Sequence, residues 1–233
     1  MEYPKTENLW VRDPESHLMA PPNGFRLESF TQVDKWLVLE KIDGMNMRVI
    51  WSPYEPSVEA NLRVLGRTDR AQIPGDLKDY MEATFTHGTM KDALRPEDGV
   101  SYPHEVILYG EGYGPGIQQG GHYRDDKSFT LFDVLIDGRW MRWDVVERVA
   151  EILDVDTPPV LGRGMDTYNV QNLVAMMVSG IVPPREWGCS TNDPEGVIAR
   201  TDPYLFDGFG RRVMFKHKVR DVAKWLDSVE FST

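Results

Sequence analysis

The segment WLVLEKIDGMN, residues 36–46, sets the expectation for the fold. Its apolar run ends at Lys41, and the Asp-Gly pair that follows is typical of a tight turn between antiparallel strands. We therefore expect residues 36–40 and 46–51 to pair as a hairpin. Burial or a neighbouring cation favours the neutral amine of a lysine, which makes that amine nucleophilic. Lys41 alone is better explained as a surface lysine at a turn, so its assignment as a nucleophile depends on the rest of the sequence.

Two acidic positions and a pair of lysines follow Lys41 along the chain. Glu111 ends an apolar run, Glu195 precedes another, and Lys216 and Lys218 flank a histidine. Either of these lysines would be the cation beside Lys41 if the last strand lies next to the first. Carboxylates bind magnesium and also accept hydrogen bonds from ribose hydroxyls, so either glutamate fits either role. Because attack on an α-phosphate needs positive charge nearby, the set favours nucleotide transfer through a lysine-bound intermediate.

Composition gives weaker limits. The 233 residues are 41% hydrophobic and 27% charged, as in globular proteins. The net charge of -11 opposes binding to nucleic acid, except through a local basic stripe. Residues 211–220 form such a stripe and hold five of the 26 basic residues, although a solvated strand explains them equally well. No stretch approaches the roughly 18 apolar residues of a membrane helix, and the start lacks signal-peptide features, so we expect a soluble intracellular protein.

The residue patterns predict a mixed fold in which strands dominate. Strands and helices do not alternate regularly, which favours an antiparallel α+β domain. The expected strands are residues 36–40, 46–51, 106–111, 129–136, 139–141, 197–200 and 213–216, and the expected helices are residues 74–85, 144–153, 169–179 and 221–229.

Together these segments resemble the covalent nucleotidyltransferase superfamily of polynucleotide ligases and messenger-RNA capping enzymes. Lys41-Ile42-Asp43-Gly44 is similar to the superfamily's lysine-any-Asp-Gly motif, whose lysine takes the nucleotide. Five further segments resemble its other motifs in the same order. They are Gly66-Arg67-Thr68, Tyr109-Gly110-Glu111, Leu131-Phe132-Asp133-Val134, Glu195-Gly196-Val197-Ile198 and Lys216-His217-Lys218.

Within the superfamily the chain looks most like RNA ligases of the phage and RNA-editing type. Those ligases have a glutamate before the lysine and an asparagine two residues after the glycine, as at Glu40 and Asn46. Their third motif often runs into a Gly-Pro-Gly-Ile-Gln-like loop, as in residues 114–118. Asp43 departs from this pattern, because that branch often has histidine there, and it looks more like DNA ligases.

The resemblance assigns five residues to the nucleotide itself. Lys41 would form the adenylate. Glu40 and the Ile42 backbone would contact adenine, and Phe132 would stack on it. Glu111 would hold the ribose.

The resemblance assigns five more residues to phosphate and metal. Arg67 would contact sugar or phosphate. Asn46 and Glu195 would organise the waters of a bound metal ion. Lys216 and Lys218 would hold the α-phosphate and promote its transfer.

The resemblance also implies the fold and the domain organisation. We expect an α+β, antiparallel-sheet nucleotidyltransferase (adenylation) domain of the ATP-grasp-like ligase type, without an OB-fold. Residues 1–233 would form this single domain, with residues 221–233 as a short C-terminal helix that packs back through Val222, Trp225 and Leu226. DNA ligases and capping enzymes usually append an OB-fold after the last motif, so the short tail favours a minimal RNA ligase.

These observations predict an ATP-dependent RNA ligase that joins 5′-phosphate and 3′-hydroxyl ends through a lysine–AMP intermediate, as in RNA repair. ATP and Mg²⁺ or Mn²⁺ are the expected cofactors, and RNA ends, or a nicked duplex, the expected partner. We expect a monomer that does not bind membranes. We expect it to act in the cytoplasm, which would be that of the host cell if a phage encodes the protein. The alternatives are an ATP-dependent DNA nick ligase, a GTP-using capping-type nucleotidyltransferase and a non-catalytic nucleotide-binding relic.

Overall fold

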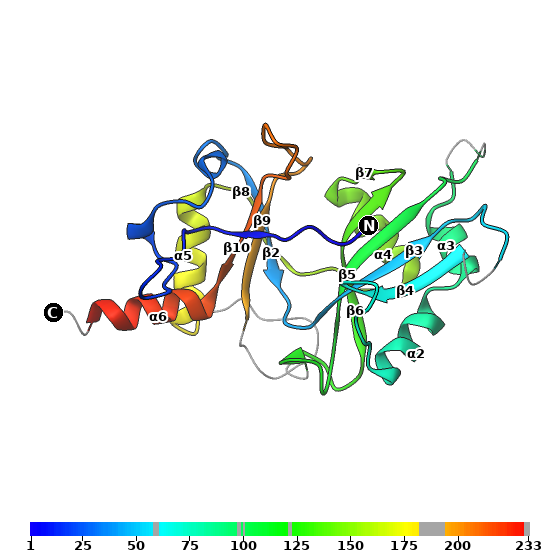
Figure 1. The fold of residues 1–233 in the computed structure, drawn as a ribbon, viewed down its shortest axis with the longest axis horizontal. Helices are drawn as coiled ribbons and strands as arrows, with labels where there is room; N and C mark the ends of the chain where they lie inside the picture. Colours follow the sequence, from blue (N-terminus) through cyan, green and yellow to red (C-terminus); the bar gives the residue numbers. More distant parts are fainter. Residues whose placement is uncertain (58–60, 97–98, 100, 121–122, 182–193, 231–233) are drawn as a thin grey trace. The chain divides into compact units, whose positions relative to one another are not determined.

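The chain folds into two compact units, shown in Figure 1. The structure is a computed structural model that describes residues 1–57, 61–96, 99, 101–120, 123–181 and 194–230. The described parts of unit 1 lie within residues 1–3 and 43–158, and those of unit 2 within residues 4–42, 159–181 and 194–230. Each unit is built on its own five-stranded sheet, and all strand pairs but one are antiparallel, so the predicted α+β class is confirmed.

The sheet of unit 1 is a continuous antiparallel ladder. Its central pair, β3 and β5, is in register from Met45–Gly112 to Trp51–Val106. The strands follow the spatial order β4 (Leu62–Gly66), β3 (Met45–Trp51), β5 (Val106–Tyr113), β6 (Ser128–Ile136) and β7 (Arg139–Trp140).

Both faces of the unit 1 sheet are packed. Helices α2 (Gly75–Thr84), α3 (His87–Ala93) and α4 (Trp143–Leu153) pack on one face. Leu77 of α2 reaches Gly112 of β5 so closely that a Cβ there would lie 2.7 Å from it. The other face carries a smaller apolar cluster built on Ile50, Ile107, Tyr109 and Leu135, with Tyr3 and Phe132 against it.

The sheet of unit 2 brings the two ends of the chain together. Strand β1 near the N-terminus pairs with β10 near the C-terminus, and this is the only parallel pair between the described strands. Two short 3₁₀ helices, Pro21–Asn23 and Glu28–Thr31, lie between β1 and β2 in sequence. The strands follow the order β1 (Glu7–Asn8), β10 (Met214–Lys218), β9 (Gly196–Arg200), β2 (Trp36–Lys41) and β8 (Val160–Met165).

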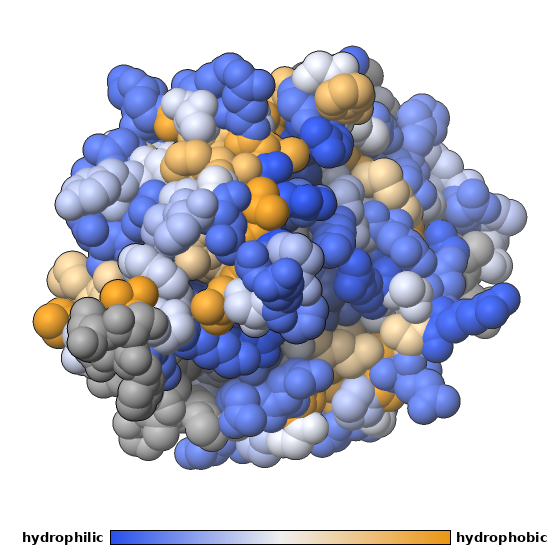
Figure 2. Space-filling model, turned by 60° about the vertical axis from the view of Figure 1, so that its left-hand side comes forward, coloured by the Kyte–Doolittle hydropathy of each residue, from blue (hydrophilic) through white to orange (hydrophobic). Residues whose placement is uncertain are grey.

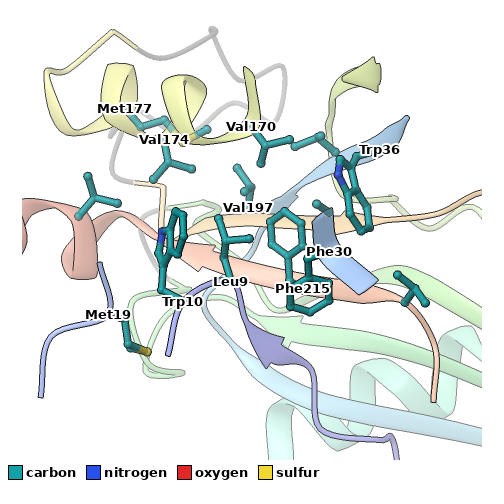
Figure 3. Packing of buried hydrophobic residues seen from close by; sticks show 14 residues of the cluster. Leu9, Trp10, Met19, Phe30, Trp36, Val170, Val174, Met177, Val197 and Phe215 are labelled. Carbon is teal, nitrogen blue, oxygen red and sulfur yellow. The ribbon is translucent and has the colours of Figure 1, made fainter. Parts of the chain in front are cut away.

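The core of unit 2 lies between this sheet and two helices, α5 (Thr167–Val178) and α6 (Val219–Glu230). Figure 3 shows apolar side chains of α5 pointing toward Val197 of the sheet, with an aromatic group beside them. In that group, the ring of Phe215 lies 4.9 Å from Trp36 and 5.2 Å from Phe30. Val222 of α6 is buried in the same core, as predicted for the C-terminal helix.

The predicted hairpin across the Asp-Gly turn was wrong. Strands β2 and β3 belong to different sheets: β8 and β9 flank β2, whereas β4 and β5 flank β3. The turn instead carries the chain from unit 2 to unit 1. Gly44 lies against the backbone of β5, where an added Cβ would come within 2.4 Å of the Gly112 oxygen. An Asp-Gly turn does not determine strand pairing when each of the two flanking strands pairs with strands from other parts of the sequence.

The predicted helices are confirmed, with small shifts at their ends. Helix α5 begins at Thr167, two residues before its predicted start, because the Asp166 carboxylate caps it by accepting a hydrogen bond from the Asn169 amide at 2.7 Å. The residue patterns did not predict strands β1, β4 and β8 or helix α3. Strand β8 contains two glycines and little apolar alternation, so its residue pattern does not predict a strand.

The surface drawn in Figure 2 is mostly hydrophilic. On the face drawn in Figure 2, hydrophobic residues gather in small groups among mostly hydrophilic ones. Among the described residues, no helix is both long enough and apolar enough to cross a membrane.

Candidate active site

Lys41 lies at the end of a row of three residues that crosses unit 2. It is in register with Gly196 of β9, and Gly196 is in register with Lys218 of β10. Strand β9 therefore separates β10 from β2, so the lysine pair of β10 is not on the strand next to Lys41. Because the middle residue of the row has no side chain, both lysines can reach the same acid from opposite sides.

Gly196 is required by its surroundings. Its φ of +148° is a conformation that residues with a side chain rarely adopt. A Cβ on this residue would lie 2.2 Å from the carbonyl oxygen of His217, which no side chain tolerates. The Glu-Gly dipeptide of the predicted motif thus has a structural basis. The glycine allows β9 and β10 to approach closely at the position next to Glu195.

The acid reached by both lysines is Glu195. Its two carboxylate oxygens accept hydrogen bonds from Lys41 Nζ and Lys218 Nζ, one lysine on each oxygen. The three side chains are mostly buried, with exposed fractions of 21% for Lys41, 13% for Glu195 and 15% for Lys218. Burial raises the pKa of Glu195, but the Lys41 charge and the hydrogen bonds from the two lysines outweigh it, so the pKa lies below its usual value.

Lys216 lies on the same face of the sheet, two residues from Lys218 along β10. It is in register with Ile198, whose partner on β2 is Leu39. Burial lowers the pKa of Lys216, and the positive charges of Lys218 and Lys41 lower it further. The structure therefore brings together on one face four of the five charged residues predicted in this unit: Lys41, Glu195, Lys216 and Lys218.

The two remaining predicted residues of unit 2 flank Lys41. Side chains alternate along a strand, so Glu40 lies on the opposite face, in the row of Val197 and His217. Its side chain is buried there. Ile42 is also buried, and its carbonyl oxygen accepts a 3.4 Å hydrogen bond from Lys41 Nζ. The predicted adenine contacts of Glu40 and Ile42 stay predictions.

In unit 1, Asn46 of β3 and Glu111 of β5 are direct partners in the antiparallel register. Side chains of such partners project from the same face of a sheet. Asn46 Oδ1 is buried and has no hydrogen-bond partner among the described residues. An unpaired buried acceptor is costly, so this oxygen is suited to a ligand or an ordered water.

Phe132 lies at an irregularity of β6. Tyr109 is paired with Asp133 but Gly110 with Leu131, which leaves Phe132 as an extra residue in the strand. The ring of Tyr3 lies 5.1 Å from Phe132, and the Tyr3 hydroxyl donates a 2.6 Å hydrogen bond to Asp133. Sequence reasoning did not single out Tyr3, because no pattern joins residue 3 to β6.

Arg67 follows β4 and is exposed. The turn that carries it is held by a buried arginine one strand away. Arg48 Nε donates to the Gly66 carbonyl at 2.8 Å, and Arg48 Nη2 pairs with Asp69 at 2.7 Å. Sequence reasoning missed Arg48, since an arginine within a strand is normally expected to face solvent.

Comparison with known proteins assigns the chain to a protein family. The sequence matches the RNA ligase family over residues 34–219. The chain belongs to the RNA ligase family. The match covers all six motif segments, including the row that carries the lysines of unit 2. A search of curated proteins found no match.

Solved structures resemble the fold of this RNA ligase family member. Naegleria gruberi RNA ligase with PPi has a TM-score of 0.60 and 16% identity over 97% of this chain and 60% of that chain. A variant of that ligase with ATP and Mn has a TM-score of 0.60 and 15% identity over 97% of this chain and 58% of that chain. At these identities the likeness shows the fold alone. The chain spans about three-fifths of the length of the ligase in these two structures.

The acids in the described parts of this family member do not form a metal cage. No group of three or more His, Cys, Asp or Glu side chains converges anywhere in the described residues. The donors expected for metal are one carboxylate, Glu195, and one amide oxygen, Asn46 Oδ1. Each of these donors by itself fits contact with a hydrated magnesium or manganese ion through its waters, because magnesium keeps several waters when it binds to proteins.

Proposed function

We propose that this chain is an ATP-dependent RNA ligase whose two units make up a nucleotidyltransferase domain. The observation that carries the proposal is the arrangement of Lys41, Glu195 and Lys218 around the bare backbone of Gly196. It provides one amine for covalent chemistry and a second cation close by. Lys216, on the same face, adds a third lysine whose pKa is lowered by burial. A cluster of lysines with one acid suits a polyphosphate substrate.

In the first step, the Lys41 amine attacks the α-phosphorus of ATP. A P–N bond forms, the bond from the α-phosphorus to the bridging oxygen breaks, pyrophosphate leaves and the amine loses a proton. Lys216 and Lys218 are the cations that stabilise the charge on the α-phosphate during this step.

The next two steps join the strands. An oxygen of the RNA 5′-phosphate attacks the same phosphorus, which breaks the P–N bond and returns Lys41 to an amine. The 3′-hydroxyl of the second strand then loses its proton and attacks the 5′-phosphate, and AMP leaves.

Residues of both units are assigned to the nucleoside. Phe132 stacks on adenine, and Glu40 and the Ile42 backbone contact its edge. Glu111 accepts hydrogen bonds from the ribose hydroxyls, as ionised carboxylates do. Arg67 contacts sugar or phosphate, which its exposure on a fixed turn supports.

Glu195 and Asn46 are assigned to the water shell of a magnesium or manganese ion. The ion would neutralise charge on the polyphosphate. A Glu195 carboxylate that turned toward this shell would no longer pair with Lys41, which would release the amine from its ion-pair partner. The unpaired Oδ1 of Asn46 supports its role as an acceptor of water protons.

Membership of the RNA ligase family favours RNA over DNA as the substrate and ATP over GTP as the donor. We also propose that the chain acts as a monomer and in the cytoplasm, where ATP and RNA ends occur together. Light scattering of the purified protein tests the first of these statements.

Transfer of label from α-labelled nucleotide to the protein tests the function. The chain should become labelled with ATP and a divalent cation, but not with GTP or in excess chelator. The labelled protein should then seal 5′-phosphate and 3′-hydroxyl RNA ends. Labelling by GTP would favour a capping-type enzyme, sealing of nicked DNA alone would favour a DNA ligase, and absence of any label would favour a non-catalytic relic.

A further inference from the structure

The connection between β9 and β10 presents an aromatic ring to solvent in a fixed conformation. Phe209 is 86% exposed, the largest exposed fraction among the exposed large hydrophobic residues of the described chain. Such a ring contributes nothing to the core of unit 2. We call residues 204–212 the arginine–aromatic tip.

Asp207 orders the turn that carries this ring. Its Oδ1 accepts hydrogen bonds from the backbone amides of Phe209 and Arg211, both at 2.9 Å, and its Oδ2 pairs with Arg211 Nε at 2.7 Å. The backbone closes the same turn, because the Asp207 amide donates to the Arg211 carbonyl at 2.9 Å. An aromatic residue held out of the core by a well-bonded turn loses little conformational freedom when it binds a ligand.

Guanidinium groups accompany the aromatic rings of the tip. The Arg211 guanidinium carbon lies 5.2 Å from the centre of the Phe209 ring. Arg212 and Arg200 both lie over Tyr204, at 4.8 Å and 3.9 Å. Although it is paired with Asp207, the Arg211 side chain is still 52% exposed. The tip therefore offers a stacking surface and a cation at the same place.

Aromatic rings combined with arginine suit unpaired nucleotides, because bases stack on the rings and the cations meet the phosphates. An apolar protein partner would have no use for the arginine beside the ring. The tip also lies at one end of the β9–β10 pair, whose other end holds Gly196 and Lys218. The strands between are five residues long, about 15 Å at the usual rise, which is a few nucleotides of RNA.

We propose that the arginine–aromatic tip binds unpaired nucleotides of an RNA end, with a base stacked on Phe209 and a phosphate near Arg211. This inference rests on the proposed RNA ligase activity and adds a strand-binding site to it. Such a contact can form despite the net charge of -11, which repels RNA, because it depends on stacking as much as on charge.

Binding of a fluorescent single-stranded RNA with a 5′-hydroxyl, which cannot be joined, tests the site separately from catalysis. The informative pair is Phe209→Leu, which keeps an apolar side chain, and Phe209→Tyr, which keeps the ring. Stacking of one base contributes roughly 1–3 kcal/mol, so Phe209→Leu should raise the Kd by about 5- to 10-fold or more. Phe209→Tyr should remain within about twofold of wild type.

Three comparisons sharpen the test. Tyr168→Leu removes another exposed ring of unit 2, on α5, and should leave the Kd unchanged. A blunt RNA duplex exposes no base faces along its length, so Phe209→Leu should not weaken its binding. Arg211→Gln should reduce the salt dependence of single-strand binding, whereas Phe209→Leu should keep it.

The outcomes separate the inference from the function on which it rests. Labelling of Lys41 by ATP should be equal in wild type and in both Phe209 variants. Wild-type affinity in Phe209→Leu, an equal loss in Phe209→Tyr, or no RNA binding by the wild type would each overturn the strand-binding site. Failure of wild-type labelling would overturn the ligase proposal instead.

Discussion

Lys41 and Glu195 form an ion pair although 154 residues separate them in the sequence. The pair holds the Lys41 amine as a hydrogen-bond donor to a carboxylate. If Lys41 is the nucleophile, as proposed above, Glu195 must give up this contact before the amine attacks.

Replacement of Lys41 should abolish covalent labelling. Lys41→Ala removes the amine, and Lys41→Arg keeps a positive charge beside Glu195 but remains protonated and cannot attack. Both variants should show no label with ATP on denaturing gels and should retain the wild-type circular dichroism spectrum. Label on either folded variant would mean that another residue is the nucleophile.

Replacement of Glu195 should weaken labelling and change its metal dependence. Glu195→Gln keeps the shape but loses the charge toward the metal waters, so the labelling rate at limiting magnesium should fall about 10- to 100-fold. A magnesium titration of the rate measures this. Glu28→Gln, at an exposed acid of the same unit, is the control. If Glu195→Gln matched this control at every magnesium concentration, the metal role would be wrong.

Gly196→Ala should destabilise unit 2 and separate the lysines. The new Cβ meets the His217 carbonyl at 2.2 Å in a backbone conformation unsuited to alanine, so a loss of about 1–3 kcal/mol is expected. Urea unfolding measures the loss. Gly208→Ala is the matched control, because a Cβ there has nothing within 4 Å and should change stability by less than about 0.5 kcal/mol. Equal stability of the two variants would contradict the close approach.

His217 should make stability depend on pH. Burial lowers the pKa of His217 from 6.5 to about 4, so between these values the unfolded chain binds a proton that the folded chain does not. The free energy of unfolding therefore decreases as the pH falls below 6.5. Between pH 7 and pH 5 the loss is about 2 kcal/mol.

Urea unfolding of wild type and His217→Gln at both pH values isolates this contribution. The variant should lose about 2 kcal/mol less than wild type between pH 7 and pH 5. His104→Gln, at an exposed histidine, should follow the wild type. Identical pH slopes for His217→Gln and wild type would show that this histidine is not buried in its neutral form.

Sequence reasoning predicted which charged residues of unit 2 lie together better than it predicted the strand order that brings them together. Lys41, Glu195 and Lys218 were expected in one site, and their register across Gly196 brings them together. That both lysines bind one carboxylate could not be predicted, because it depends on which strand lies between them. The false hairpin has the same cause, since pairing is decided by edges far away in the sequence.

The misses in unit 1 have a different origin. Arg48 and Tyr3 act through buried hydrogen bonds and ring contacts, and neither lies in a pattern that predicts burial. Of the arginine–aromatic tip, only Arg211 and Arg212 lie within the basic stripe predicted from the sequence. Its exposed ring became informative once the hydrogen bonds of Asp207 were known.

The strand order of unit 2 also determines when this protein can mature during synthesis. Strand β2 pairs with β9, and β1 pairs with β10. These pairs cannot form until β9 and β10 have been synthesised and have left the ribosome. At about 5–20 residues per second, the 154 residues from Lys41 to Glu195 take roughly 8–30 s to be made. The strands of unit 1 are complete by Trp140 and can pair during this time. The lysine cluster is thus among the last features to form, so a chain that ends before β10 cannot assemble it.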